Sequence, residues 1–257
     1  MAATRYILYH HPYSICSIMV RYTYAVTGRP LDPSSAMELD EQSLDIMKGA
    51  QLEENFLVKV NPKGQVPALT SSSLDTPITD SLDITYYIAE RYPTLMPSKH
   101  KQTIIDLLGE LHDINYFSLS FGDKPDRAKG QANVIRGRME DSNISPEYRK
   151  ALEYKLGITN DMKVDGVQPD IIKLNEKRAS AFSEKCENML LPGQTWLFGT
   201  QLPTALDAHL VVFLARMKDL KRTNLVPGKL SEYLERATND REWLKVMKGQ
   251  TSTMVGG

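Results

Sequence analysis

Cysteine is scarce in this sequence, with only Cys16 and Cys186 among 257 residues. Two cysteines cannot form the disulfide framework of a small secreted domain. No spacing of cysteine, histidine and carboxylate residues matches a metal site either. We therefore expect no metal and a protein that works in a reducing cytoplasm.

Long apolar runs and a charge excess are also missing. No apolar stretch approaches the roughly 20 residues of a membrane helix, so we expect no membrane partner. The formal net charge is −1, and the basic residues are dispersed rather than arranged in a stripe with aromatics. This pattern excludes a nucleic-acid surface. The start of the chain is poor in acids, as in mitochondrial transit peptides, but the same residues are needed for the first strand and helix.

The length of the chain allows two domains with cores of their own, and no internal repeat divides it further. We place a first domain at 1–93 and a second at 102–257. The linker between them, 94–101, follows Tyr92-Pro93 and is rich in charge. Apolar residues at helical spacing come after it and predict the first helix of an all-helical domain: Ile104, Leu107, Leu108, Leu111, Ile114 and Phe117.

The first domain reads as alternating strands and helices. A buried strand at 6–9 is followed by a turn, and then by a helix capped by Ser14 that extends to Gly28. We expect a short strand at 37–40 and partial helix at 51–58. Further strands fall within 60–69 and 77–79.

The start of the first helix is a candidate site for an anion. No Asp or Glu precedes Asp32, so no carboxylate nearby in the sequence opposes negative charge there. Helix N-termini lower the pKa of a thiol from its usual value of about 8.5. The Ser14 hydroxyl is placed to donate a hydrogen bond to such a thiolate. The nucleophile would then be the thiolate of a bound cofactor.

Two later segments suggest how a small peptide is held. Val66-Pro67 lies between strand-like runs, where a cis bond would explain the proline. A cis-proline turn presents the peptide groups of Val66 to an extended ligand. Asp80-Ser81 begins the next helix, whose N-terminus favours a carboxylate, with Ser81 as a good cap and Asp80 able to receive an ammonium group.

These motifs together resemble the glutathione S-transferase superfamily. Ser14-Ile15-Cys16-Ser17, followed by Val20-Arg21, is similar to the Ser-x-Cys-Ser-x-x-Val-Arg signature of its zeta class, and Asn61-Pro62 through Gln65-Val66-Pro67 matches that class too. The resemblance implies a thioredoxin-like α/β domain, an all-helical C-terminal domain, glutathione as cofactor and a homodimer. The glutathione-binding residues that it implies are Ser14, Lys63, Gln65, Val66, Pro67, Asp80 and Ser81.

The class also suggests a reaction. Zeta enzymes are maleylacetoacetate isomerases, in which glutathione assists the cis–trans isomerisation of a conjugated double bond. Two positions differ here: Ile15 replaces a serine, and Tyr13 replaces a common arginine. Loss of that cation favours a neutral or apolar conjugated alkene over a dicarboxylate, as in microbial natural-product pathways.

Several alternatives stay open. The thiolate adduct can be released as a stable conjugate, or the fold can bind glutathione or apolar ligands without turnover. Oxidative deglutathionylation would use Cys16 as nucleophile, although Cys16 can equally support Ser14 or simply pack in the core. His11 and Tyr13 are candidate substrate contacts, with a solvated turn favoured for His10-His11. Tyr116 and Phe117 either wall the substrate pocket or belong to the core.

The second half contains one further motif. Thr204 and Asp207 form a predicted capping box at the start of a helix that is apolar on nearly every side. This follows Trp196-Leu197-Phe198-Gly199 and resembles the folding motif of the superfamily's C-terminal domain. We expect Asp207 and His209 to be structural. The polar stretch 122–175 should contain two helices and a loop that shapes substrate entry.

Overall fold

A small mixed sheet forms the centre of the N-terminal half. The structure is a computed structural model and describes residues 3–254. Strand β1 (Thr4–His10) runs parallel to β2 (Met37–Ser43) and antiparallel to β3 (Ala68–Thr70), in the order β2-β1-β3. Ile78 adds one antiparallel bridge to Leu69. Alternate residues of β1, such as Tyr6 and Leu8, are buried beneath the helices.

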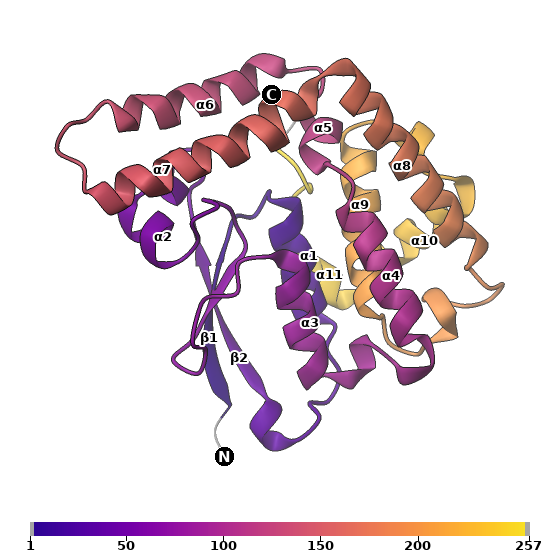
Figure 1. The fold of residues 1–257 in the computed structure, drawn as a ribbon. Helices are drawn as coiled ribbons and strands as arrows, with labels where there is room; N and C mark the ends of the chain where they lie inside the picture. The colour runs from indigo at the N-terminus through magenta and orange to yellow at the C-terminus, as the bar shows by residue number, and fades with distance from the viewer. Residues whose placement is uncertain (1–2, 255–257) are drawn as a thin grey trace.

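Helices α1 (Ile15–Ala25) and α3 (Ser81–Arg91) lie side by side on one face of this sheet, and α2 (Glu54–Lys59) lies near its edge (Figure 1). Ser14 caps α1 as predicted, because its side chain accepts from the backbone N–H of Ser17. The helix ends at Ala25, three residues before the predicted end at Gly28. Most of α1 is buried because α3 packs on one side of it and α9 on another.

From the end of α3 to residue 254, all regular elements are helical. They are α4 (Lys101–His112), α5 (Tyr116–Phe121), α6 (Pro125–Met139), α7 (Pro146–Thr159), α8 (Pro169–Asn188), α9 (Ala205–Asp219), α10 (Gly228–Thr238) and α11 (Arg241–Met247). This confirms the predicted fold class, a thioredoxin-like α/β unit followed by an all-helical one. The division at 94–101 stays a prediction. Within residues 3–254, no helix is both long and apolar enough to cross a membrane.

Helix α9 is the centre of the helical part. Every residue from Ala205 to Met217 is buried, as the apolar sequence predicts. The predicted capping box is confirmed: Thr204 Oγ1 accepts from the Asp207 N–H, and the Asp207 carboxylate accepts from the Thr204 N–H at 2.8 Å. Asp207 also accepts from the Leu197 N–H and the Tyr233 hydroxyl. The carboxylate therefore joins α9, α10 and the segment before α9.

Three local predictions were wrong. Asp80 rather than Ser81 caps α3, since its side chain accepts from the Leu82 N–H, and Ser81 is the first helical residue. The segment 60–67 is a turn rather than a strand. The helix predicted through Phe117 breaks after α4, because the side chain of Asn115 caps a new helix by accepting from the N–H groups of Phe117 and Ser118.

The stretch 122–175 holds α6 and α7, as expected, and the beginning of α8. In Figure 1, α6 and α7 form a long pair that reaches over α2 in the N-terminal half. A π-helical turn (Asn160–Val164) and a short 3₁₀ turn lead from α7 into α8. Asn115 ties this turn to α5 by donating from Nδ2 to the carbonyl of Met162 at 2.7 Å. The pair thus brings side chains of the helical half over the N-terminal one.

Candidate functional site

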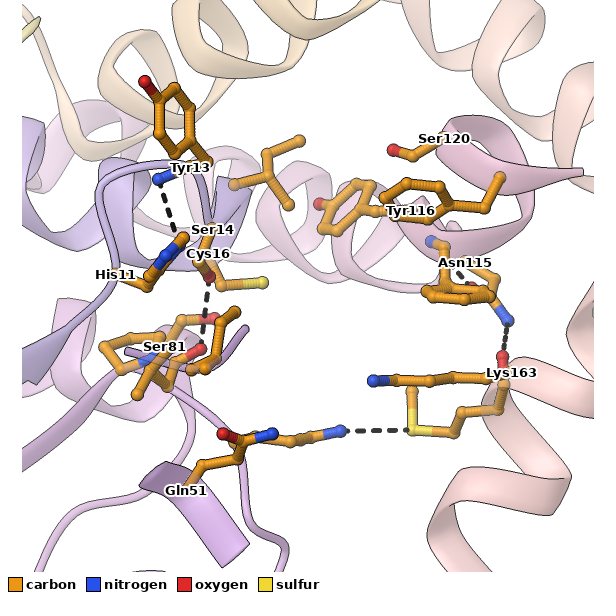
Figure 2. Close-up of a pocket in the computed structure, with 18 of the residues that line it drawn as sticks. His11, Tyr13, Ser14, Cys16, Gln51, Ser81, Asn115, Tyr116, Ser120 and Lys163 are labelled. Atoms are coloured by element: carbon orange, nitrogen blue, oxygen red, sulfur yellow. Dashed lines mark hydrogen bonds between the residues drawn. The ribbon is translucent and has the colours of Figure 1, made fainter. Parts of the chain in front are cut away.

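A pocket of about 360 Å³ lies between the two halves of the chain. Figure 2 shows its two facing walls: His11, Tyr13, Ser14, Cys16 and Ser81 on one, and residues of α5 and the π-helical turn on the other. Of the site residues predicted from the sequence, all but Lys63 line it: His11, Tyr13, Ser14, Cys16, Gln65, Val66, Pro67, Asp80, Ser81, Tyr116 and Phe117.

Ser14 lies where α1 begins, and both capacities of its hydroxyl are in use. Its Oγ accepts from the Ser17 N–H at 3.3 Å and donates to the carbonyl of Val66, also at 3.3 Å. Both bonds are long, so they are weak. Because the bond to the Val66 carbonyl is weak, the hydroxyl hydrogen can turn to a stronger acceptor on a ligand.

The Val66–Pro67 peptide bond is cis, as predicted. The loop before it is held by Asn61, which is fully buried and donates from Nδ2 to the carbonyl of Gln65 at 2.8 Å. Gly64 adopts φ +54° in this loop. The turn therefore presents the backbone of Val66 to the pocket from a rigid support.

Asp80 presents a carboxylate at the start of α3. One oxygen caps the helix, and the other lies 3.9 Å from Lys63 Nζ. Lys63 itself does not line the pocket, and its ammonium group lies beside Asp80, which does. The second carboxylate oxygen and the helix N-terminus together offer a place for a zwitterionic group, an ammonium beside a carboxylate.

Cys16 lines the pocket as a neutral thiol. Burial raises its pKa to about 11, and the nearby Asp80 carboxylate adds to this, although a hydrogen bond with Ser81 acts in the opposite direction. A thiol with such a pKa is a poor nucleophile at neutral pH. The Asp80 carboxylate, predicted for the site from the start of the next helix, thus adds a negative charge near this thiol.

The two histidines before Ser14 are both buried, so the prediction of a solvated turn was wrong. His11 lines the pocket, where its Nδ1 accepts from the Tyr13 N–H at 3.3 Å (Figure 2). Burial lowers the pKa of His11, and Asp45 partly opposes this. His10 lies outside the pocket and beside Glu41.

The facing wall is aromatic, with two cations that the sequence did not single out. Tyr116 and Phe117 both line the pocket, and the Tyr116 hydroxyl donates to the carbonyl of Leu111. Lys163 Nζ lies 5.2 Å from the centre of the Phe117 ring and donates to Gln131 Oε1 at 2.6 Å. Arg127 lies over the Phe121 ring at 4.4 Å. Because both lie in the mostly polar stretch 122–175, nothing in the sequence separated these two cations from surface charge.

Lys163 and Arg127 have no carboxylate within ion-pair distance among residues 3–254. Burial lowers the pKa of Lys163 to about 8, and the positive charge of Arg127 adds to this effect. Two cations that lie close enough to repel one another therefore share one wall of the pocket. An anionic group on a ligand would relieve this repulsion.

Arg216 closes the pocket at the C-terminal end. It extends from α9, is 4% exposed, and donates to the carbonyl of Tyr13 at 2.8 Å and to the carbonyl of Ser252. One guanidinium thus joins the loop before Ser14 to the segment after α11. Sequence reasoning missed this residue because its partners lie 203 and 36 positions away.

The part of the chain that the structure describes contains no group of three or more metal-ligating side chains. The side chains that line the pocket offer hydroxyl groups, imidazoles, cations, the Asp80 carboxylate and the Cys16 thiol. This composition suits the binding of a small zwitterionic peptide on one wall and of a largely apolar ligand with an anionic group on the other.

The comparison with protein families matches residues 8–98 to the N-terminal domain of glutathione S-transferases. This range covers β1 through α3 and includes Ser14, the cis Val66–Pro67 bond and Asp80. No curated protein sequence matches the chain significantly.

Solved structures similar to this chain extend the likeness to its helical half. Glutathione transferase F7 from Populus trichocarpa is 19% identical, with 96% of this chain and 99% of that one covered and a TM-score of 0.61. Maleyl pyruvate isomerase, a bacterial glutathione S-transferase in zeta class, is 19% identical, with 93% of this chain and 95% of that one covered and a TM-score of 0.57. A glutathione transferase homologue from Burkholderia with bound glutathione is 13% identical over 95% and 96%, with a TM-score of 0.55. Likeness at these identities shows the fold.

Proposed function

We propose that this protein binds glutathione and activates its thiolate for addition to an electron-poor conjugated double bond. The observation that carries the proposal is the meeting of three separate segments in one pocket. The Ser14 hydroxyl at the start of α1, the cis Val66–Pro67 turn and the Asp80-Ser81 start of α3 all line it. The match of residues 8–98 to the glutathione S-transferase N-terminal domain supports this ligand.

Each part of the tripeptide has a complementary group. The γ-glutamyl carboxylate would bind the N–H groups at the start of α3, and its ammonium would bind Asp80. The peptide groups of the glutathione cysteine would pair with the backbone of Val66. The Ser14 hydroxyl, which donates to the Val66 carbonyl at 3.3 Å, would turn to the sulfur, because a thiolate is the stronger acceptor.

The reaction would begin with attack of the thiolate on the alkene. In isomerisation, the former double bond rotates as a single bond, and elimination of the thiolate restores the alkene. In conjugation, the adduct is protonated and leaves. We favour isomerisation, which the zeta-class resemblance supports, and keep conjugation as the main alternative. The high pKa of Cys16 weighs against deglutathionylation through that residue.

The residues of the pocket change which substrate we expect. Its aromatic wall suits the largely apolar conjugated molecule that the sequence suggested, but Lys163 and Arg127 favour a negative charge over a neutral molecule. We therefore propose a conjugated alkene with a carboxylate remote from the double bond. The glycyl carboxylate of glutathione is the other group that these cations could bind.

The variant Lys163→Met shows whether Lys163 binds the carboxylate of the substrate or the glycyl carboxylate of glutathione. If Lys163 binds the substrate, the variant should raise KM for an acidic enone by about tenfold, as expected for one charge-assisted hydrogen bond, while KM for its methyl ester and the Kd of glutathione stay unchanged. If Lys163 binds glycine, the Kd of glutathione should rise, whereas the Kd of γ-glutamylcysteine should not.

The proposal itself is tested by titrating the thiolate absorbance of bound glutathione. A hydrogen bond to a charged group contributes about 1.5–3 kcal/mol, or roughly one to two pKa units. The bound thiol should therefore have a pKa well below about 8.5, and Ser14→Ala should raise it by that amount. Ser120→Ala is the matched control, because Ser120 lines the same pocket on α5 and contacts Arg216 rather than the thiol site.

Ser14→Ala also removes a helix cap, which costs about 1 kcal/mol, so its thermal stability is measured in parallel. Binding of glutathione without any pKa shift in the wild type would favour a non-catalytic binding module. Absence of binding would refute the proposal. Product mass then separates the two reactions, since an isomer keeps the mass of the substrate and an adduct gains that of glutathione.

The assembly and the location of the protein stay predictions. We propose a homodimer in the cytoplasm, on the basis of the superfamily resemblance and the scarcity of cysteine. Sedimentation equilibrium of the full chain tests the first, and a fluorescent fusion tests the second.

A further inference from the structure

A line of hydrogen bonds leads from the core to the pocket through two histidines. The Thr85 hydroxyl donates to the carbonyl of Ser81 at 2.9 Å. His209 Nε2 lies 2.9 Å from the same hydroxyl oxygen, and His209 Nδ1 lies 2.9 Å from His112 Nε2. His209 is buried in the core, as expected for a structural histidine, and its two ring nitrogens link Thr85 to His112.

The positions of the heavy atoms favour one arrangement of the hydrogens. Thr85 has a single hydroxyl hydrogen, and the carbonyl of Ser81 can only accept it. If that hydrogen pointed to His209 instead, two oxygen atoms would face one another at 2.9 Å without a hydrogen between them. The hydroxyl therefore accepts from His209 Nε2–H.

The same reasoning then fixes the second histidine. With its hydrogen on Nε2, the neutral His209 has a lone pair on Nδ1, so His112 must donate from Nε2–H. His209 stays neutral because burial lowers its pKa far below the ordinary value. Burial also lowers the pKa of His112 and so favours its neutral form, in which the remaining nitrogen, Nδ1, is a lone-pair acceptor.

His112 lines the pocket, at the end of α4 and opposite the start of α3. Its Nδ1 has no hydrogen-bond partner within residues 3–254. This atom is also not fully buried. The side chains around His112 are His209, the ring of Tyr116 with its centre 6.1 Å away, and the Asp80 and Asp113 carboxylates. Of the two carboxylates, Asp80 also lines the pocket.

We propose that His112 is a catalytic acid–base residue, which takes the thiol proton of bound glutathione on Nδ1 and can return it to the adduct. This inference rests on the proposed function. Ser14 cannot take that proton, because its hydroxyl must donate to the thiolate. Cys16 cannot either, since it is itself protonated at neutral pH.

The steps balance in protons and electrons. The S–H bond of glutathione breaks and an Nδ1–H bond forms, which leaves a thiolate beside an imidazolium. The thiolate adds to the alkene, and the π electrons move onto the electron-withdrawing group. Either Nδ1–H then returns its proton to carbon, which gives the conjugate and neutral His112, or the new C–S bond breaks, which gives the isomer and restores the ion pair.

Thr85 and His209 are positioning residues in this scheme. They hold His112 in the acceptor tautomer and do not touch the substrate. Thr85→Val keeps the shape of the side chain but removes the hydroxyl. His112 should then populate both tautomers, whereas a purely structural role for Thr85 would leave its tautomer unchanged.

The test is nitrogen NMR of the full-length protein with ¹⁵N-labelled histidine, which reports protonation at each ring nitrogen. His112→Gln assigns the His112 signals among the five histidines. In the free wild type we expect a protonated Nε2 and an unprotonated Nδ1. With glutathione bound, we expect both nitrogens to be protonated. A protonated Nδ1 in the free protein would overturn the inference.

Thiolate absorbance of the same samples separates failure of this inference from failure of the proposed function. Thiolate with an unchanged His112 would refute the role of His112 alone, and absence of thiolate would refute both. Proton release gives a second measurement in weakly buffered solution. The wild type should release clearly less than one proton per thiolate, and His112→Gln should release a full one. Equal release from both proteins would overturn the proposal.

Discussion

Acid should destabilise this protein through a histidine that folds in its neutral form. His10 ends β1, is 7% exposed, and has a pKa lowered to about 4. Burial is the main cause, and Arg21 adds to it. Glu41, 3.8 Å from His10 Nε2, acts in the opposite direction but is already paired with Arg21 at 2.8 Å.

The sign follows from linkage. In the unfolded chain His10 binds a proton below a pH of about 6.5, whereas in the folded protein it does so only near pH 4. The unfolded state therefore binds more protons as the pH falls, and stability decreases. Each pKa unit corresponds to about 1.36 kcal/mol. Protonation of His10 should therefore lower the free energy of unfolding by about 2 kcal/mol between about pH 7 and about pH 5.

Urea unfolding at these two pH values, for wild type and His10→Gln, measures this contribution. The variant should lose about 2 kcal/mol less than the wild type on acidification, whatever its stability at neutral pH. His100→Gln is the control, because His100 stacks on the Phe198 ring at a centroid distance of 4.6 Å and is only half-buried. An identical acid loss in wild type and His10→Gln would refute this account of His10.

Three further substitutions test the architecture around the pocket. Asp207→Ala should destabilise the protein by at least about 3 kcal/mol in urea, because the buried Leu197 N–H, Thr204 N–H and Tyr233 hydroxyl lose their acceptor; a loss below about 1 kcal/mol would contradict this. Gly64→Ala should lower the free energy of unfolding by about 1–2 kcal/mol, since φ is +54° and the new Cβ would lie 2.9 Å from Leu57 Cδ2. It should also weaken glutathione binding, measured by calorimetry. Gly130→Ala is the control, because it has open space around it and should change neither quantity. Arg216→Lys should speed the exchange of backbone amide hydrogens at 10–14 and 250–254, because one amine cannot replace both hydrogen bonds of the guanidinium. Unchanged exchange would show that these hydrogen bonds do not hold the two segments.

Much of the N-terminal half could be predicted from the sequence because the interactions that define it join residues close together in the chain. Ser14 caps α1 through a neighbour three positions away, and the same short range holds for the capping box of Thr204 and Asp207. The cis Val66–Pro67 bond was predictable because a proline next to a strand, here β3, requires a structural reason, although the predicted strand before it is a turn. Ser81 was misread as a cap because Asp and Ser cap helices equally well, and only the backbone geometry at Asp80 decides between them.

The facing wall of the pocket was not readable, because it is assembled from distant segments. Lys163 belongs to a π-helical turn that follows α7, and its partner Gln131 lies 32 positions earlier on α6. Both are polar residues in a polar stretch, so periodicity gives them no distinct role. The sequence therefore favoured a neutral substrate from the missing arginine at Tyr13, while the fold supplies positive charge from another element.

The histidine pair shows the same limit and its consequence for function. The apolar helix around His209 predicts a buried, structural residue, and His209 is buried. What the sequence could not give is the partner 97 positions away, which turns a buried, neutral imidazole into the group that sets the tautomer of His112. A core residue can thus determine proton chemistry in the pocket without lining it. The same position would be inert if position 112 held a residue that could not donate to it, so the role of His209 belongs to the pair and cannot be assigned to either residue alone.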